Sequence, residues 1–255
     1  MNVKLLDFTQ DALSLLLRTK NTRLKFESDP ATWTDAQRAE HLSYMRDTIK
    51  SSWEFVAYTF EISGVTRAFT HQLVRTRTGV YAQESQRTVD VRDNPVLMPE
   101  SVLAFERQRS YWQKAQAESV EAYTRMIEQG IPVQDARGIL PTNMTTSIVA
   151  KFSLRTLHEM AKVRLCTRTQ GEYQQVFREM RRLVIEQHPW VAEHRFIEVH
   201  CVSEGTCAFP RFGQTSCNFY DPRMNQRVVK EITFQKFWSE APQVAVPVAK
   251  NGKTM

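Results

Sequence analysis

Two segments of this 255-residue chain share one order, a short apolar strand that runs directly into an amphipathic helix. In the first, residues 53–62 (WEFVAYTFEI) are rich in the β-branched and aromatic residues typical of strands, and Gly64 is expected to break the strand. The following helix is predicted from apolar residues at helical spacing, namely Val65, Ala68, Phe69 and Leu73. Gln72 lies on this otherwise apolar face.

The second segment repeats the order with residues 147–153 (SIVAKFS) as its strand. Its helix carries Leu154, Leu157, Ala161 and Leu165 at helical spacing. Each unit ends in an arginine-bearing turn, VRTRT at 74–78 and VRLCTRT at 163–169. This echo is too short to be a sequence repeat, but two such turns can face each other across one pocket.

Three further helices are predicted. One begins at Thr34, which has Gln37 at capping-box spacing. A long one covers Pro99 to Gln129 and ends at Gly130, and its stripe containing Trp112 is typical of a core or subunit contact. The last carries an apolar face from Tyr173 to Val184, and we expect Arg178, Arg181 and Arg182 to be solvated charge beside that face.

The composition sets limits but indicates no function. Hydrophobic residues make up 42% of the chain and no apolar run reaches the length of a membrane span. The N-terminus lacks the pattern of a signal peptide, so we expect a cytoplasmic protein. Four cysteines are too few for a disulfide scaffold, and the spacing of His200, Cys201, Cys207 and Cys217 fits no standard zinc site, so no metal is expected.

The stretch from Arg75 to Arg87 (RTRTGVYAQESQR) holds three arginines with amide and hydroxyl side chains. Arg75 and Arg77 would point to different sides of a continued helix, so they converge only if the helix ends there and the chain turns. Guanidinium and amide groups suit a phosphate and a heterocycle edge, whereas the alternative is a solvated surface loop. The net charge of +6 also fits nucleic acid, but the arginine clusters lack interleaved aromatic residues and no recognition helix is apparent.

This stretch resembles the flavin-dependent thymidylate synthases. Their hallmark is R-H-R, seven residues, then Ser, and here Arg75-Thr76-Arg77 is followed by seven residues and Ser85. The preceding GVTRAFTHQLVR, the segment RGILP from Arg137 and the helix from Ser153 to Arg164 are also similar to that family. The resemblance covers roughly residues 35 to 190.

The resemblance implies an α+β fold like that of the thymidylate synthase complementing proteins, a single domain with a small mixed or antiparallel sheet and several long helices. We expect this domain over residues 1–200, with a C-terminal extension over 201–255 packed on it and a flexible tail from about 241. The implied enzyme transfers a one-carbon unit from methylenetetrahydrofolate to C5 of dUMP, with FAD as cofactor and NADPH as reductant, giving dTMP. A homotetramer with sites at subunit interfaces is also implied.

Site residues follow from the resemblance position by position. Those implied for FAD are Ser51, Glu54, Arg75, Thr76, Arg77, Ser153, Arg155 and Glu159. Those implied for dUMP are Gln72, Gln83, Ser85, Arg87, Arg137 and Arg164. Of these, Arg164 is expected to stabilise enolate charge on the uracil, and Ser85 to act at the substrate as a binding hydroxyl.

Several positions depart from the family pattern. The hallmark histidine is Thr76, and two further histidines are replaced by Ile49 and Phe55. Relatives carry asparagine where this chain has Ser153 and Glu159, and tyrosine where it has Thr88. The alternatives are therefore a relative that hydroxymethylates, one that uses another pyrimidine nucleotide such as dCMP, and a nucleotide-binding protein without catalysis. The sequence assigns no role to Cys201, Cys207, Cys217 or the C-terminal tail.

Overall fold

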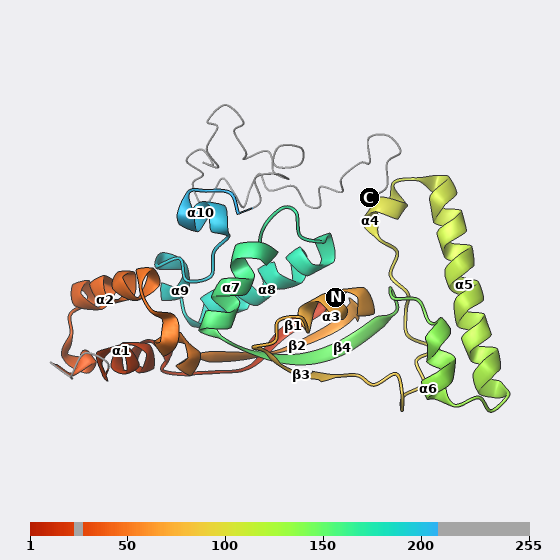
Figure 1. Ribbon diagram of the computed structural model, residues 1–255, viewed down its shortest axis with the longest axis horizontal. Helices are drawn as coiled ribbons and strands as arrows, with labels where there is room; N and C mark the ends of the chain where they lie inside the picture. The colour runs from red at the N-terminus through yellow and green to blue at the C-terminus, as the bar shows by residue number, and fades with distance from the viewer. Residues whose placement is uncertain (23–27, 209–255) are drawn as a thin grey trace. The chain divides into compact units, whose positions relative to one another are not determined.

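The computed structural model describes residues 1–22 and 28–208. It contains an antiparallel sheet of four strands in the order β1-β2-β4-β3 (Figure 1). The strands are β1 (Asn2–Phe8), β2 (Ala57–Thr66), β3 (Val80–Gln83) and β4 (Thr145–Ser153). This sheet and the helices around it confirm the α+β class.

Strands β2 and β4 alternate between buried and less buried positions, as strands do when one face packs against a core. Tyr58, Phe60 and Ile62 are the buried residues of the first half of β2. The prediction that Gly64 breaks the strand is wrong, because β2 continues to Thr66. Gly64 has a φ of 64°, and a Cβ placed there would lie 3.3 Å from the backbone nitrogen of Met1. Glycine is therefore required for both conformation and close approach.

Both predicted strand–helix units are confirmed, and a hydroxyl begins each helix. Strand β2 leads into α3 (Arg67–Leu73) and strand β4 into α7 (Leu154–Arg164). The side chain of Thr66 accepts a hydrogen bond from the Phe69 amide, and that of Ser153 accepts one from the Thr156 amide. These N-caps satisfy amides that have no partner within the helix. The start of the first predicted strand is corrected, since Lys50–Phe55 is a 3-10 helix, η2.

The chain divides into two compact units, Met1–Lys4 with Phe60–Ala150 and Leu5–Thr59 with Lys151 onward. The first unit holds α3, β3, α4 (Glu100–Leu103), α5 (Glu106–Glu128), α6 (Val133–Ala136) and the 3-10 helix η3 (Arg137–Ile139). The predicted helix over 99–129 is thus two helices interrupted at Ala104 and Phe105, with Gly130 after it at a φ of 82°. Beside α5, buried Val91, Tyr123, Ala136 and Met144 form a local core.

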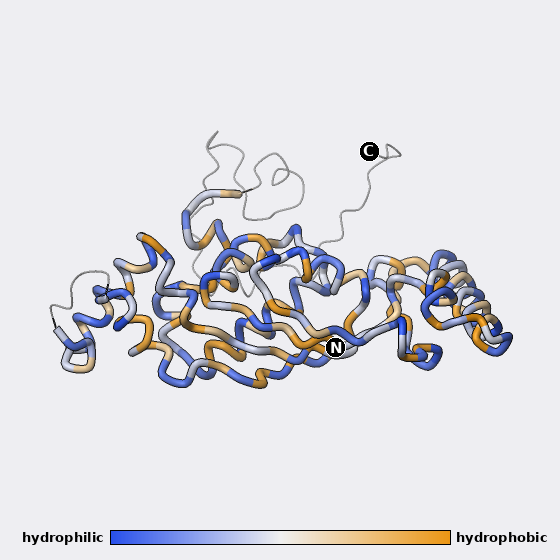
Figure 2. The backbone as a smooth tube through the Cα atoms, turned by 60° about the horizontal axis from the view of Figure 1, so that its bottom comes forward, coloured by the Kyte–Doolittle hydropathy of each residue, from blue (hydrophilic) through white to orange (hydrophobic). Residues whose placement is uncertain are grey.

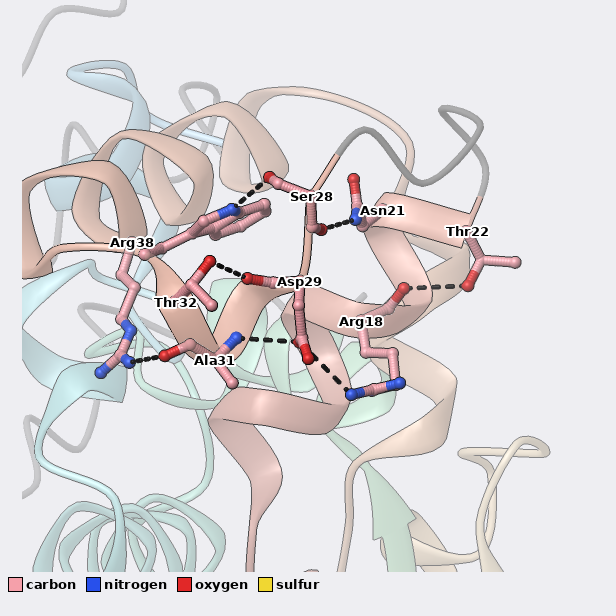
Figure 3. A network of polar contacts seen from close by, with 9 residues as sticks. Arg18, Asn21, Thr22, Ser28, Asp29, Ala31, Thr32 and Arg38 are labelled. Carbon is pink, nitrogen blue, oxygen red and sulfur yellow. Dashed lines mark hydrogen bonds and ion pairs between the residues drawn. The ribbon is translucent and has the colours of Figure 1, made fainter.

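The second unit holds the remaining described helices, with α7 packed on α8 (Figure 1). They are α1 (Ala12–Thr22), η1 (Pro30–Thr32), α2 (Asp35–Asp47), η2, α7, α8 (Gly171–Gln187), α9 (Trp190–Glu193) and α10 (His200–Glu204). The capping box of Thr34 and Gln37 is confirmed. Before it, Asp29 caps η1 through the Ala31 amide and pairs with Arg18, which ties η1 to α1 (Figure 3).

The expectation that Arg181 is solvated is wrong. Its guanidinium lies 3.3 Å from a carboxylate oxygen of Glu198, which is 1% exposed, and its Nε donates to the Ile197 carbonyl. Burial raises the pKa of the Glu198 carboxyl, and Arg181 opposes that shift. Arg182, by contrast, is exposed and pairs with Glu179 and Glu186 on its own helix, as the sequence predicts.

The expected extension and tail lie mostly outside the described residues, as does Cys217, and the boundary near residue 200 stays a prediction. Within residues 1–22 and 28–208, no helix is both long and apolar enough to span a bilayer.

Candidate active site

The arginine-bearing turn after α3 is confirmed. The Arg75 amide donates to the Gln72 carbonyl at 3.2 Å, and the Thr76 amide donates to the Leu73 carbonyl at 3.0 Å. These are the short-range bonds of a helix end, so Arg75 and Arg77 lie on a turn and both are exposed. Their guanidinium groups are therefore available to a ligand.

A tyrosine that the sequence reasoning missed holds this turn. The Tyr81 hydroxyl on β3 donates to the Thr76 carbonyl at 2.6 Å and lies 3.0 Å from the Leu73 carbonyl. One side chain thus binds the last turn of α3 and the residue between the two arginines. The signal available in the sequence is an aromatic hydroxyl four residues after Arg77.

The amide and hydroxyl residues of the motif follow on and after β3. Gln83 donates through its side-chain amide to the Thr70 hydroxyl at 2.8 Å, which attaches β3 to α3. Ser85 accepts a hydrogen bond from the Arg87 amide at 3.2 Å, so a local turn begins at Ser85. Arg87 itself is exposed.

Arg137 lies at the start of η3, and its Nε donates to the Gln134 carbonyl at 3.1 Å. It acts electrostatically on Arg67, a half-buried residue that we did not single out in the sequence. Burial lowers the pKa of Arg67, the nearby Glu84 raises it and the positive charge of Arg137 lowers it further. The charges of Glu84 and Arg137 thus both act on Arg67, with opposite signs.

In the second unit, three residues implied for FAD contact one another. The Ser153 hydroxyl donates to Glu54 at 2.6 Å, and the Arg155 guanidinium lies 3.3 Å from the other Glu54 oxygen. Glu54 and Ser51 belong to the same 3-10 helix, η2. The side chains of Arg155 and Glu54 are 50% and 45% exposed, so this ion pair contributes little to stability and its groups remain accessible.

Glu159 lies one helical turn after Arg155 on α7. Lys162 pairs with it at 3.2 Å, and the His158 Nε2 atom lies 3.8 Å from it. His158 is 3% exposed and hydrogen-bonded to the Phe196 carbonyl at 2.7 Å, with the Trp53 ring against it. Burial is the main cause that lowers the pKa of His158 to about 4, so the ring is neutral near pH 7.

Arg164 is the last residue of α7, and its guanidinium carbon lies 4.4 Å from the centre of the Tyr173 ring. At this distance the cation is attracted to the face of the ring, which restricts the side chain. Because Arg164 belongs to the second unit, its joint action with the dUMP residues of the first unit stays a prediction.

The donor set fits a flavin dinucleotide in its chemistry. A diphosphate needs charge-assisted donors, and each unit has exposed guanidinium groups, those of Arg75 and Arg77 in the first and that of Arg155 in the second. The carboxylates of Glu54 and Glu159 are paired with Arg155 and Lys162, which reduces their repulsion of an anion. Across the part of the chain that the structure describes, no group of three or more His, Cys, Asp or Glu side chains is arranged to hold a metal ion.

Residues 4–190 match the model of the family described as thymidylate synthase complementing protein. The chain belongs to this family. It is 31% identical over 212 residues, 79% of each chain, to a flavin-dependent thymidylate synthase of Sulfurisphaera tokodaii. It is also 38% identical over 137 residues to one of Geobacter sulfurreducens, covering 53% of this chain and 59% of the relative, and 30% identical over 199 residues to one of Saccharolobus solfataricus, covering 74% of each.

As a member of this family, the chain is a flavoprotein and an enzyme of the transferase class. The matched residues include every implied site residue from Ser51 to Arg164. Thr76 is the position at which this family member lacks the hallmark histidine. Its backbone carbonyl is bound by Tyr81, so the turn is held without an imidazole.

Proposed function

We propose that this chain synthesises dTMP from dUMP, with FAD as its bound cofactor, methylenetetrahydrofolate as the one-carbon donor and NADPH as the reductant. The observation that carries the proposal is the R-T-R motif with Ser85, placed on the turn after α3 and on the segment after β3 within the matched region. Flavin supplies the redox chemistry when bound, and the protein supplies binding and orientation.

The proposed nucleotide site uses the dUMP residues in distinct roles. Arg87 and Arg137 bind the phosphate through charge-assisted hydrogen bonds. Gln72 and Gln83 offer amide groups to the nucleotide, and Ser85 offers a hydroxyl.

Arg164 is the proposed electrostatic group of the reaction. Negative charge develops on the uracil oxygen as C5 becomes nucleophilic, and a guanidinium group beside that oxygen stabilises it. The cation–π contact with Tyr173 restricts Arg164 before substrate arrives, which reduces the entropy lost on binding.

For FAD we propose residues in each unit separately. Arg75 and Arg77 of the first unit offer guanidinium groups to the diphosphate. Within the second unit, Ser51 and Glu159 offer polar groups, and Ser153 and Glu54 orient Arg155. Thr76 stands where the family has a histidine, so one imidazole is missing from the family's motif. Because this change can alter the reaction, the identity of the product is the first property to measure.

The test incubates purified protein with FAD, NADPH, methylenetetrahydrofolate and dUMP, and determines the mass of the nucleotide product. We expect a methyl gain, the flavin absorption spectrum in the purified protein, and no product when FAD is omitted from the apoprotein. A hydroxymethyl gain, or turnover of dCMP in place of dUMP, would establish the divergent reaction. Tight dUMP binding without a mass change would establish a binding protein without catalysis.

We also propose a homotetramer. The supporting observation is the surface of α4, α5 and their connection, where Leu103, Phe105 and Tyr111 are 49%, 57% and 62% exposed. Hydrophobic and hydrophilic residues both occur along α5 (Figure 2), and Tyr123 is the residue of this helix that is buried. The other hydrophobic residues of α5 are therefore at least partly exposed. Exposed apolar residues grouped in this way are typical of interaction sites. Light scattering after size-exclusion chromatography should give four times the monomer mass. The Phe105→Glu variant should give a lower mass.

The proposed location is the cytoplasm. The supporting observation is that the chain has four cysteines, too few for the disulfide scaffold typical of secreted proteins.

A further inference from the structure

Glu84 lies between Gln83 and Ser85, yet no role was implied for it. It follows directly after β3, at the point where the chain leaves the strand and enters the turn that carries Ser85 and Arg87. Its side chain is partly buried and makes contacts with two other segments of the first unit.

The first contact is with β4. The Glu84 backbone amide donates to the Ser147 carbonyl at 3.0 Å, and the Ser147 amide donates to the Glu84 side-chain Oε2 atom at 3.2 Å. A single residue therefore engages both backbone groups of Ser147. The carboxylate takes the place that a backbone carbonyl would occupy if β3 continued, so the pairing is preserved while the chain turns away.

The second contact is with the segment before α4. The Asn94 side-chain amide donates to the other Glu84 oxygen at 3.0 Å and to the Thr145 carbonyl at 3.1 Å. Thr145 in turn donates through its amide to the Pro95 carbonyl at 2.8 Å. Asn94 thus joins the carboxylate to the start of β4.

The third contact is made by the backbone carbonyl of Glu84. Arg67 is within 3.5 Å of the Glu84 backbone carbonyl, and the charge of Glu84 acts on Arg67. Glu84 therefore contacts α3, β4 and the segment at Asn94. These contacts also limit where its neighbours Gln83 and Ser85 can lie.

We propose that Glu84 is a positioning residue for the nucleotide site. Its carboxylate, bound by Ser147 and Asn94, fixes the end of β3 so that Gln83 and Ser85 point to the substrate. Hydrogen bonds from backbone and side-chain amides to a carboxylate suit this task because they are directional and stronger than those to a neutral acceptor. The inference rests on the proposed function for the identity of the ligand. The hydrogen bonds from Ser147 and Asn94 to the Glu84 carboxylate do not depend on that identity.

The test compares Glu84→Gln, Glu84→Ala and Asn94→Ala with Glu61→Gln, a control on β2 whose carboxylate pairs with Lys4 at the surface. Calorimetry should show dUMP binding weakened about tenfold or more in Glu84→Ala and less in Glu84→Gln, which retains one acceptor. The KM for dUMP should rise more than kcat falls. Adding Asn94→Ala to Glu84→Ala should change the affinity little further, because Glu84→Ala already removes the contact with Asn94.

Hydrogen exchange gives a readout that needs no ligand. Amides of residues 84–89 and of Ser147 should exchange faster in Glu84→Ala than in the wild type, whereas Glu61→Gln should leave them unchanged. If exchange and dUMP affinity both match the wild type, the positioning role is excluded. If the wild type fails to bind dUMP but amide exchange is still faster in Glu84→Ala, the proposed ligand is wrong. The role of the Glu84 carboxylate in fixing the end of β3 is then still supported.

Discussion

The Tyr81 hydroxyl lies 2.6 Å from the Thr76 carbonyl, and it holds the turn between Arg75 and Arg77 through backbone rather than side chain. The identity of residue 76 can therefore vary without release of the turn. The turn is thus held by a backbone contact in a motif whose hallmark histidine is a threonine.

Replacing Tyr81 with phenylalanine should loosen this turn while retaining the ring. We expect a loss of about 1 kcal/mol in the free energy of unfolding and weaker FAD binding, because two carbonyl groups lose their donor. Titration of the apoprotein with FAD, followed by flavin fluorescence, measures the affinity. Tyr44→Phe, at a half-exposed tyrosine of α2, is the matched control. Equal FAD affinity in Tyr81→Phe and the wild type would show that the hydroxyl does not shape the flavin site.

Substitution of Arg87 by alanine should weaken dUMP binding by roughly 1.5–3 kcal/mol, as expected for loss of a charge-assisted contact to phosphate. Arg87 is exposed and its substitution leaves the core intact, so the unfolding midpoint should not change. Calorimetry with dUMP checks the affinity, with Arg182→Ala at an exposed arginine of α8 as control. Unchanged affinity would remove Arg87 from the site.

Ser153 has two functions that different substitutions separate. It caps α7 through the Thr156 amide and donates to Glu54. Ser153→Ala should lower the free energy of unfolding by about 1 kcal/mol through loss of the cap, and should also weaken FAD binding. Ser153→Asn retains a capping side chain, so its stability should lie close to that of the wild type. Urea denaturation measures the first effect and flavin titration the second. Equal stability of the alanine variant and the wild type would contradict the capping role.

His158 should make stability depend on pH in acid. Its pKa is about 4 in the folded protein against 6.5 ordinarily, so between these values the unfolded chain binds a proton that the folded chain does not. The contribution is fully present above pH 6.5 and is lost as the pH falls to about 4, with a slope of about 1.4 kcal/mol per pH unit. Urea titrations of wild type and His158→Gln over this range should differ by that slope. Parallel pH profiles would rule out His158 as the source.

Local elements of the fold were predictable because their signals lie within a few residues. The capping box at Thr34 and Gln37, the helix end before Arg75 and the strand–helix order of both units all depend on near neighbours in sequence. The resemblance to the family likewise supplied the candidate residues, whose roles stay predictions. Two of the predictions that failed concerned Gly64, which lies close to Met1, and Arg181, whose charge pairs with Glu198; both partners are distant in sequence.

The sequence by itself therefore determined the class of fold, the family and the residue types of the candidate site. Tertiary structure alone decided how those residues are held. Glu84 and Ser147 are 63 residues apart and Ser153 and Glu54 are 99 residues apart, yet each pair is joined by a hydrogen bond. Such contacts leave no periodic signal, because they arise when sheet pairing and helix packing bring distant segments within the short range of a hydrogen bond.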